Sequence, residues 1–287
     1  MLDARRRAML EAMGIVPWWP PAVPAAGAHD DAAPLLLQRA GLPPQTTAPE
    51  RVRPLAVPAA PAAPDMPAAA APPPPRPAGP HPGASPDWAA LEADIAACQR
   101  CSLSQCRRLA VPGMGDRSPD WLVVGEAPGE EEDRQGLPFV GRAGQLLDRM
   151  LGAMGLQRGQ RVYITNVIKC RPPQNRNPEA EEIAQCTPYL LRQVDWLRPK
   201  LVLAMGRFAA HTLLAEGGAM PAEVLRQMPL GKLRGRVHEV TLAGQRLPLV
   251  VTYHPAYLLR SPSEKAKAWD DLCLALDTWA GQAADPA

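Results

Sequence analysis

A long stretch rich in proline and alanine, between Val16 and Pro86, sets the strongest limit on what this chain can fold into. The chain has 36 prolines among 287 residues, well above the roughly 5% of average usage, and most of them lie in this stretch. Proline lacks an amide donor and alanine buries little surface, so the stretch does not offset the entropy lost on ordering. We predict a disordered, partly polyproline tether over 21–85, a folded domain over 86–280 and a short disordered tail over 281–287.

The segment before the tether, residues 1–20, can form a short helix followed by the aromatic sequence IVPWW. A helix and two tryptophans ahead of a flexible tether are typical of a peptide that docks on a partner protein; a frayed terminus with a chance aromatic pair is the alternative. No run of about eighteen apolar residues predicts a membrane span, and the start lacks the apolar region of a secretory signal. We expect a cytoplasmic protein with no membrane association.

Strand and helix patterns alternate through the folded part of the chain. Apolar runs predict buried strands at 121–125, 161–170 and 200–206, and a hairpin that turns at Ala243 and Gly244 delivers a last strand into His254. Strands separated by helices predict a parallel sheet with helices on both faces. Because ligands bind beyond the carboxyl ends of such strands, we expect the motifs GEAPG, TNVIKC and TYHPAYLLR to meet at one crevice.

The chain has six cysteines, which in a reducing compartment indicate metal or redox chemistry rather than disulfides. Cys98 and Cys101 form a C-x2-C pair, and Cys106 follows closely. Cys170 closes a predicted strand, and Cys186 lies in the next helix. Thiolates from a tight turn and from distant elements can hold a tetrahedral metal or a cubane cluster, and the spacing does not separate zinc from iron–sulfur. The role of Cys106 stays open.

Several long motifs, taken in order along the chain, resemble one known family. The sequences CQRC, VVGEAPGEEEDRQGLPFVGRAG, YITNVIKCRPPQNRNP and YHPAYLLRSPS, together with Cys186, resemble the family 4 uracil-DNA glycosylases, the class that carries a 4Fe-4S cluster. The resemblance covers about residues 88–279. It implies a three-layer α/β/α uracil-DNA glycosylase-like fold around a central, mainly parallel four-stranded sheet. It also implies a 4Fe-4S cluster bound by Cys98, Cys101, Cys170 and Cys186.

The activity that the resemblance implies is hydrolysis of the N-glycosidic bond of uracil in DNA. This reaction releases free uracil, leaves an abasic site and begins base excision repair. We expect a monomer that acts on single- or double-stranded DNA containing uracil. A non-catalytic iron–sulfur protein that binds DNA or transfers electrons on the same fold is the alternative.

A glycosylase must extrude its base into a pocket and read it there, and the resemblance assigns four residues to that pocket. Phe139 would stack on the base. Asn166 has an amide donor and acceptor that match O4 and N3–H of uracil but mismatch cytosine. His254 would donate a hydrogen bond to O2 as negative charge collects there, and the backbone of Ala127 would approach the base. Many family 4 members have glycine where Ala127 stands.

Four consecutive acids follow the GEAPG turn, and carboxylates repel phosphate, so the turn is not a nucleotide cradle. Negative charge suits a cationic sugar and an attacking water. Glu126 would position or activate that water, and Glu132 would assist it or exclude the 5-methyl group of thymine. We interpret Glu130, Glu131 and Asp133 as a solvated helix start that complements the helix dipole.

The candidate DNA contacts lie in three basic or apolar loops. Tyr257, Leu258 and Leu259 are suited to fill the gap that an extruded base leaves. Basic side chains beside the cluster and the pocket would give sequence-independent, salt-sensitive phosphate binding. These candidates are Lys169, Arg171, Asn175, Arg176, Lys232, Arg234 and Arg260.

Overall fold

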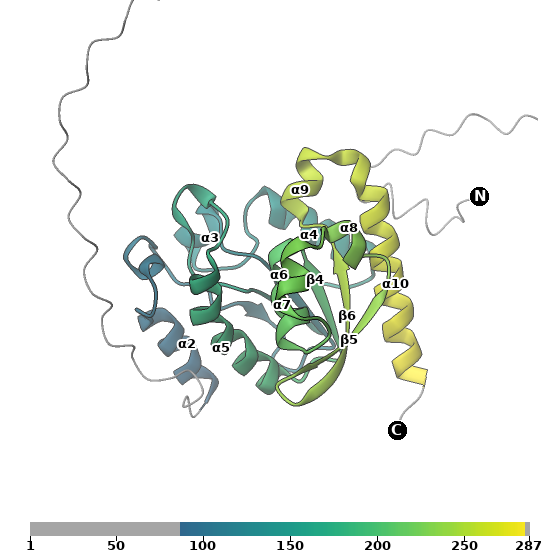
Figure 1. Cartoon of the computed structure of the whole chain (residues 1–287), viewed down its shortest axis with the longest axis horizontal. Coiled ribbons are helices and arrows are strands. Elements are labelled where there is room, and N and C mark those ends of the chain that lie inside the picture. Colours follow the sequence, from purple (N-terminus) through teal and green to yellow (C-terminus); the bar gives the residue numbers. More distant parts are fainter. Residues whose placement is uncertain (1–86, 285–287) are drawn as a thin grey trace, which may run out of the picture. The chain divides into compact units, whose positions relative to one another are not determined.

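The computed structural model describes residues 87–284 (Figure 1). The predictions for the N-terminal segment 1–20 and the tether 21–85 lie outside the described residues, as do residues 285–287. The described part begins with helix α2, Trp88–Ala97, whose first turn is capped by the Asp87 carboxylate accepting from the Ala90 amide at 2.7 Å.

One sheet runs through the described part, with six strands in the order β1-β3-β2-β4-β6-β5. The strands are β1 Met114–Gly115, β2 Trp121–Gly125, β3 Val162–Asn166, β4 Leu201–Met205, β5 Val237–Leu242 and β6 Gln245–Thr252. Neighbours among β3, β2, β4 and β6 pair in parallel, and β1 and β5 pair antiparallel at the two edges. The predicted four-stranded parallel centre is confirmed. The edge strand β1 was not predicted, because two residues carry no readable period.

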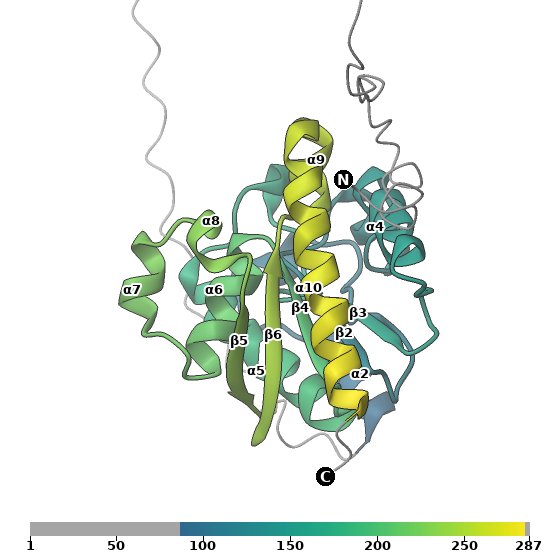
Figure 2. The same ribbon diagram turned by 90° about the vertical axis from the view of Figure 1, so that its right-hand side faces the viewer.

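Helices pack on both faces of this sheet, so the predicted three-layer arrangement is confirmed (Figures 1 and 2). One face is covered by α2, α5 and α6, and the other by α4, α9 and α10. Every residue of β2, β3 and β4 is buried, as expected for strands covered on both sides. The helices that follow α2 are α3 Glu130–Gln135, α4 Arg142–Ala153, α5 Ala180–Leu197, α6 Arg207–Glu216, α7 Ala222–Gln227, α8 Leu230–Leu233, α9 Pro255–Arg260 and α10 Lys265–Ala284.

The last helix, α10, continues past the predicted end of the domain at residue 280. Residues 281–284 were expected in a disordered tail but are helical, because the alanines after Gly281 favour helix and no proline follows until residue 286. No helix among residues 87–284 has the length and apolar content needed to cross a membrane.

The carboxyl ends of the parallel strands lie at one edge of the sheet. Gly125 of β2 is in register with Asn166 of β3, and Met205 of β4 with Thr252 of β6. The three motifs expected to meet therefore do so at this edge, and they line one cleft.

Candidate active site

A cleft of about 630 Å³ opens at the carboxyl edge of the sheet. It receives residues from the ends of all four parallel strands and from the loop that contains Phe139. The residues that line it include Glu126, Ala127, Glu132, Phe139, Asn166, Asn175, Arg176, Arg207, Tyr253, His254 and Arg260. All the residues predicted to read the base are among them.

Phe139 lies at the inner wall of the cleft in a strained backbone conformation. Its φ is 53°, in the left-handed region, and its side chain is 5% exposed. Arg158 holds this turn by donating to the Pro138 carbonyl and to the Phe139 carbonyl, each at 2.8 Å. A Cβ on Gly144 would lie 1.7 Å from the Phe139 carbonyl oxygen, so only glycine fits there. Strain maintained by such surroundings is typical of functional sites.

Asn166 is 1% exposed, and its Oδ1 has no hydrogen-bond partner among the described residues. Buried polar atoms nearly always have partners, so an unpaired acceptor on a cleft wall suits a ligand that donates to it. Gly125 lets the amide and the Phe139 ring approach each other. A Cβ on Gly125 would lie 2.4 Å from Asn166 Oδ1 and 2.5 Å from Phe139 Cζ.

His254 stands directly before α9, and its ring faces the Phe139 ring with centroids 5.4 Å apart. Its Nδ1 accepts from the Ala256 amide at 3.2 Å, so the proton of the neutral ring lies on Nε2. Burial lowers the pKa of His254 to about 4; repulsion from Arg260 adds to this, and Glu132 opposes it. The imidazole is therefore neutral at neutral pH and can donate one hydrogen bond through Nε2.

Glu126 follows β2 and is partly buried in the cleft. Burial raises the pKa of its carboxyl group, while the charges of Arg207 and Arg260 lower it. Arg207 was not among the site residues predicted from the sequence. Arg207 follows Gly206 at the carboxyl end of β4, and residues at the carboxyl ends of parallel strands line ligand crevices. This position was the signal from which Arg207 could have been predicted.

Glu132 acts on the backbone of the Phe139 turn. Its Oε1 accepts from the amides of Val140 at 2.9 Å and Gly141 at 3.0 Å, and its Oε2 accepts from the Gly129 amide at 3.0 Å. Oε1 thereby holds the turn against α3, and Oε2 caps the start of α3. This geometry favours a positioning role for Glu132 over the direct catalytic role that the sequence suggested.

The interpretation of the neighbouring acids as a solvated helix start was partly wrong. Glu130 is exposed, and Glu131 pairs with Arg134 at the surface. Asp133, however, is 3% exposed and accepts a hydrogen bond from the Arg108 amide at 2.9 Å. It ties α3 to the segment that follows the cysteine pair.

Two of the predicted DNA contacts point into the protein. Leu258 is fully buried and belongs to the core between the sheet, α4 and α10, so it cannot serve as a wedge. Tyr257 and Leu259 on the same helix are 36% and 37% exposed. Lys169, predicted to bind phosphate, is 1% exposed. Its ammonium is engaged inside the fold.

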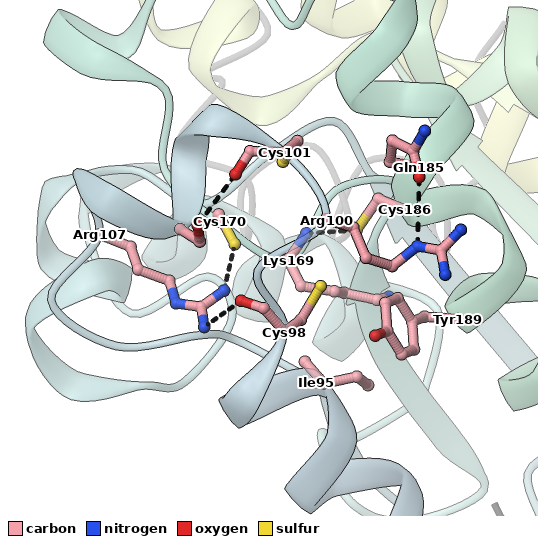
Figure 3. Close-up of a pocket in the computed structure, with 11 residues that line it drawn as sticks. Ile95, Cys98, Arg100, Cys101, Arg107, Lys169, Cys170, Gln185, Cys186 and Tyr189 are labelled. Atoms are coloured by element: carbon pink, nitrogen blue, oxygen red, sulfur yellow. Dashed lines mark hydrogen bonds between the residues drawn. The ribbon is translucent and has the colours of Figure 1, made fainter. Parts of the chain in front are cut away.

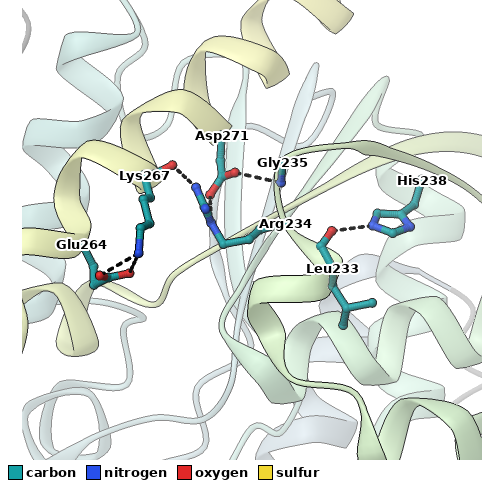
Figure 4. A network of polar contacts seen from close by, with 7 residues as sticks. All are labelled: Leu233, Arg234, Gly235, His238, Glu264, Lys267 and Asp271. Carbon is teal, nitrogen blue, oxygen red and sulfur yellow. Dashed lines mark hydrogen bonds and ion pairs between the residues drawn. The ribbon is translucent and has the colours of Figure 1, made fainter.

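Arg234 also faces inward (Figure 4). Its Nε donates to the fully buried Asp271 carboxylate at 2.9 Å, and its guanidinium lies 5.0 Å from the centre of the Tyr253 ring. Burial still raises the pKa of Asp271 to about 6. We therefore remove Arg234 from the candidate phosphate ligands and interpret it as support for the segment before His254. Lys232 is exposed.

The rim loop after Cys170 contains the remaining basic candidates. Arg171 donates through Nε to Asn175 Oδ1 at 2.8 Å. Arg176 donates to both oxygens of Glu182 at 2.9 and 2.6 Å, and Glu182 is 2% exposed. This bidentate pair fixes the loop and leaves Arg176 less available for phosphate than the sequence suggested.

Four of the six cysteines line one small hollow (Figure 3). They are the predicted ligands Cys98, Cys101, Cys170 and Cys186. Positive charge and N–H donors face their sulfurs, because Arg107 donates to Cys170 Sγ at 2.9 Å and the Lys169 amide donates to Cys186 Sγ at 3.2 Å. Cys106 is exposed and lies outside the lining.

Within residues 87–284 no group of three or more His, Cys, Asp or Glu side chains lies close enough together to hold one metal ion. The four cysteines of the hollow are nevertheless the type and number of ligands that an iron–sulfur cluster takes. A cubane cluster is larger than one ion and takes four thiolates spread around it. Hydrogen bonds to sulfur are a usual part of such sites.

Comparison with known proteins assigns this architecture to a family. Residues 112–273 match the family model described as the uracil DNA glycosylase superfamily. The type-4 uracil-DNA glycosylase of Pyrobaculum aerophilum is 42% identical over 177 residues, which are 62% of this chain and 87% of that protein. The protein of the same name from Archaeoglobus fulgidus is 41% identical over 169 residues, 59% and 81% of the two chains. That from Thermotoga maritima is 39% identical over 170 residues, 59% and 82%.

Proposed function

The chain belongs to the type-4 uracil-DNA glycosylases of the uracil DNA glycosylase superfamily, and we propose that its cleft hydrolyses the N-glycosidic bond of uracil in DNA. The protein is then a DNA repair hydrolase that releases free uracil and leaves an abasic site. One observation carries the proposal for the site: the unpaired Oδ1 of Asn166 shares a cleft with the Phe139 ring and the neutral His254 ring.

Base recognition relies on Asn166 and Phe139. The amide of Asn166 accepts from uracil N3–H through Oδ1 and donates to O4 through Nδ2. Cytosine has an amino group at C4 and no proton on N3, so the same amide would face it with both pairings reversed. Mismatched polar groups buried in a pocket cost a few kcal/mol. Phe139 stacks on the pyrimidine, and the backbone of Ala127 borders it.

The reaction breaks the bond between C1′ of the sugar and N1 of uracil, and the electron pair leaves with the base. His254 donates a hydrogen bond from Nε2 to O2, where negative charge collects. Glu126 orients the attacking water, accepts its proton and stabilises the cationic sugar. Arg207 and Arg260 favour the ionised form of Glu126, and Glu132 holds the Phe139 turn.

The cysteine site would hold a 4Fe-4S cluster on Cys98, Cys101, Cys170 and Cys186. When bound, the cluster supplies iron–thiolate bonds that join chain segments distant in sequence. Arg107 supports this assignment, because the same guanidinium that donates to Cys170 Sγ also donates to the Cys98 carbonyl at 2.9 Å. The role proposed for the cluster is structural, since it fixes the rim loop beside the cleft.

The DNA strand would cross the rim of the cleft. Arg260, Arg171 and Lys232 would contact phosphates. Asn175 lies beside Arg171 on the rim loop. Leu259, next to the exposed Tyr257, would fill the space of the extruded base. These contacts would be independent of sequence and would weaken with salt.

The proposal is tested by incubating the cluster-containing protein with a uracil oligonucleotide and cleaving abasic sites with alkali. Free uracil and strand scission are expected from the uracil strand and not from a matched cytosine strand. His254→Ala should slow excision by roughly 100-fold or more while leaving DNA binding nearly unchanged. His211→Ala is the control, since that ring bonds the Met228 carbonyl outside the cleft at 3.2 Å. No scission from a protein with an intact cluster would leave the non-catalytic alternative standing.

A further inference from the structure

We infer that Lys169 is a positioning residue: it links the cysteine site to Asn166 and thereby determines how tightly the protein binds uracil. This inference rests on the proposed function. Lys169 directly precedes Cys170, and its side chain turns away from solvent, with 1% of the residue exposed (Figure 3). A lysine is almost never fully buried unless its ammonium is paired. The partners of this ammonium identify its role.

All three donors of the ammonium are used. Nζ donates to Thr165 Oγ1 at 2.6 Å, to the Asn166 carbonyl oxygen at 2.7 Å and to Gln193 Oε1 at 2.7 Å. Gln193 is held in turn, because its Nε2 donates to the Pro112 carbonyl at 2.8 Å. The ammonium therefore fixes the peptide of Asn166 against α5 from beneath.

The backbone of Lys169 makes the second attachment. Its amide donates to Cys186 Sγ at 3.2 Å, and its carbonyl accepts from the Val111 amide at 2.8 Å. Cys186 and Gln193 lie on one face of α5, since seven residues make close to two helical turns. Lys169 is thus bound to α5 at two points, one in the cysteine hollow and one beneath Asn166.

The residues between these two points are also fixed. The Val167 amide donates to the Gly125 carbonyl at 2.9 Å, and the Ile168 amide donates to the Glu126 carbonyl at 3.2 Å. The segment from Asn166 to Cys170 therefore has little freedom to move independently. A displacement of the cysteine hollow would move the amide that reads the base.

The test is Lys169→Met, which keeps the length of the stem and removes the ammonium. Free uracil binding is measured by calorimetry on the cluster-containing protein, and iron per chain is measured alongside. Loss of one positioning contact should weaken uracil binding roughly tenfold while iron content stays at the level of the unmodified protein. Lys200→Met is the matched control, because Lys200, directly before β4, is exposed and forms an ion pair with Asp120. This variant should change neither uracil affinity nor iron content.

A double-mutant cycle separates positioning from general damage. In an Asn166→Ala background, Lys169→Met should lower kcat/KM for excision by less than about twofold, since the group that it positions is gone. Unchanged uracil affinity in Lys169→Met, or an equal loss of kcat/KM in both backgrounds, would overturn the inference.

A second variant is used if Lys169→Met cannot be purified as a folded protein that contains its cluster. Gln193→Met keeps the lysine charge and removes one acceptor. If Gln193→Met weakens uracil binding in the unmodified protein but has no further effect in the Asn166→Ala background, the inference is supported. Unchanged binding in the Gln193→Met variant would overturn it. If the unmodified protein released no uracil, the proposed function would fail instead.

Discussion

The sharpest prediction concerns Gly125, where β2 ends between the two groups that read the base. In Gly125→Ala the added Cβ would meet Asn166 Oδ1 at 2.4 Å and Phe139 Cζ at 2.5 Å, whereas ordinary contact begins at 3.4 Å. One or both groups must therefore shift by about 1 Å. A misplacement of this size costs about 100-fold in rate, and overpacking of a buried site costs about 1–3 kcal/mol of stability.

The assay is kcat/KM for uracil release from a single-stranded oligonucleotide, with the folded fraction followed by circular dichroism. Gly152→Ala in α4 is the matched control, since nothing lies within 4 Å of its added Cβ. A glycine-to-alanine change inside a helix should stabilise the protein by roughly 0.5–1 kcal/mol and leave excision unchanged. If Gly125→Ala retained full kcat/KM, or lost it only in proportion to unfolding, the proposed reading of uracil by Asn166 and Phe139 would be wrong.

Three further predictions concern pH, the wedge and the hairpin. The fall of kcat/KM at acid pH should report protonation of Glu126, whose pKa is raised by burial above the usual 4.5, because His254 stays neutral down to about pH 4. Glu126→Gln should flatten this fall, and an unchanged fall in that variant would refute the assignment. Leu258→Ala should cost about 2–5 kcal/mol in urea unfolding; Leu259→Ala should stay within about 0.5 kcal/mol but slow excision from duplex DNA, and the reverse pattern would contradict the burial of these side chains. Ala243→Asn should stabilise the turn by about 0.5–1 kcal/mol, since Ala243 has φ 48° and Gly244 φ 76°; a loss of stability would count against this turn geometry.

Features written in local patterns were predictable from the sequence. Alternating strand and helix patterns predicted the parallel centre of the sheet, because each strand is a short apolar run between helices. The rule that ligands bind at the carboxyl ends of parallel strands then predicted the meeting of Glu126, Asn166 and His254. The C-x2-C pair and two distant cysteines indicated a shared metal or cluster site, because thiolates from a tight turn and from distant elements can surround one.

Features that depend on distant partners were not predictable. Arg234 and Asp271 lie 37 positions apart, and nothing in the basic run GKLRGR indicates that one arginine turns inward. Leu258 and Leu259 are adjacent on α9, a helix of six residues, too short for a readable period. Lys169 was interpreted as a phosphate ligand because its three acceptors, two in β3 and one in α5, cannot be inferred from the residues around it.

We expect uracil to bind in the cleft at the carboxyl edge of the sheet, and a crystal structure of the cluster-containing protein soaked with free uracil would show where it lies. The pyrimidine ring should lie against Phe139, with N3–H and O4 at the Asn166 amide and O2 within hydrogen-bonding distance of His254 Nε2. Uracil bound outside this cleft, or bound in it with its O2 edge turned away from His254, would show that these residues do not read the base.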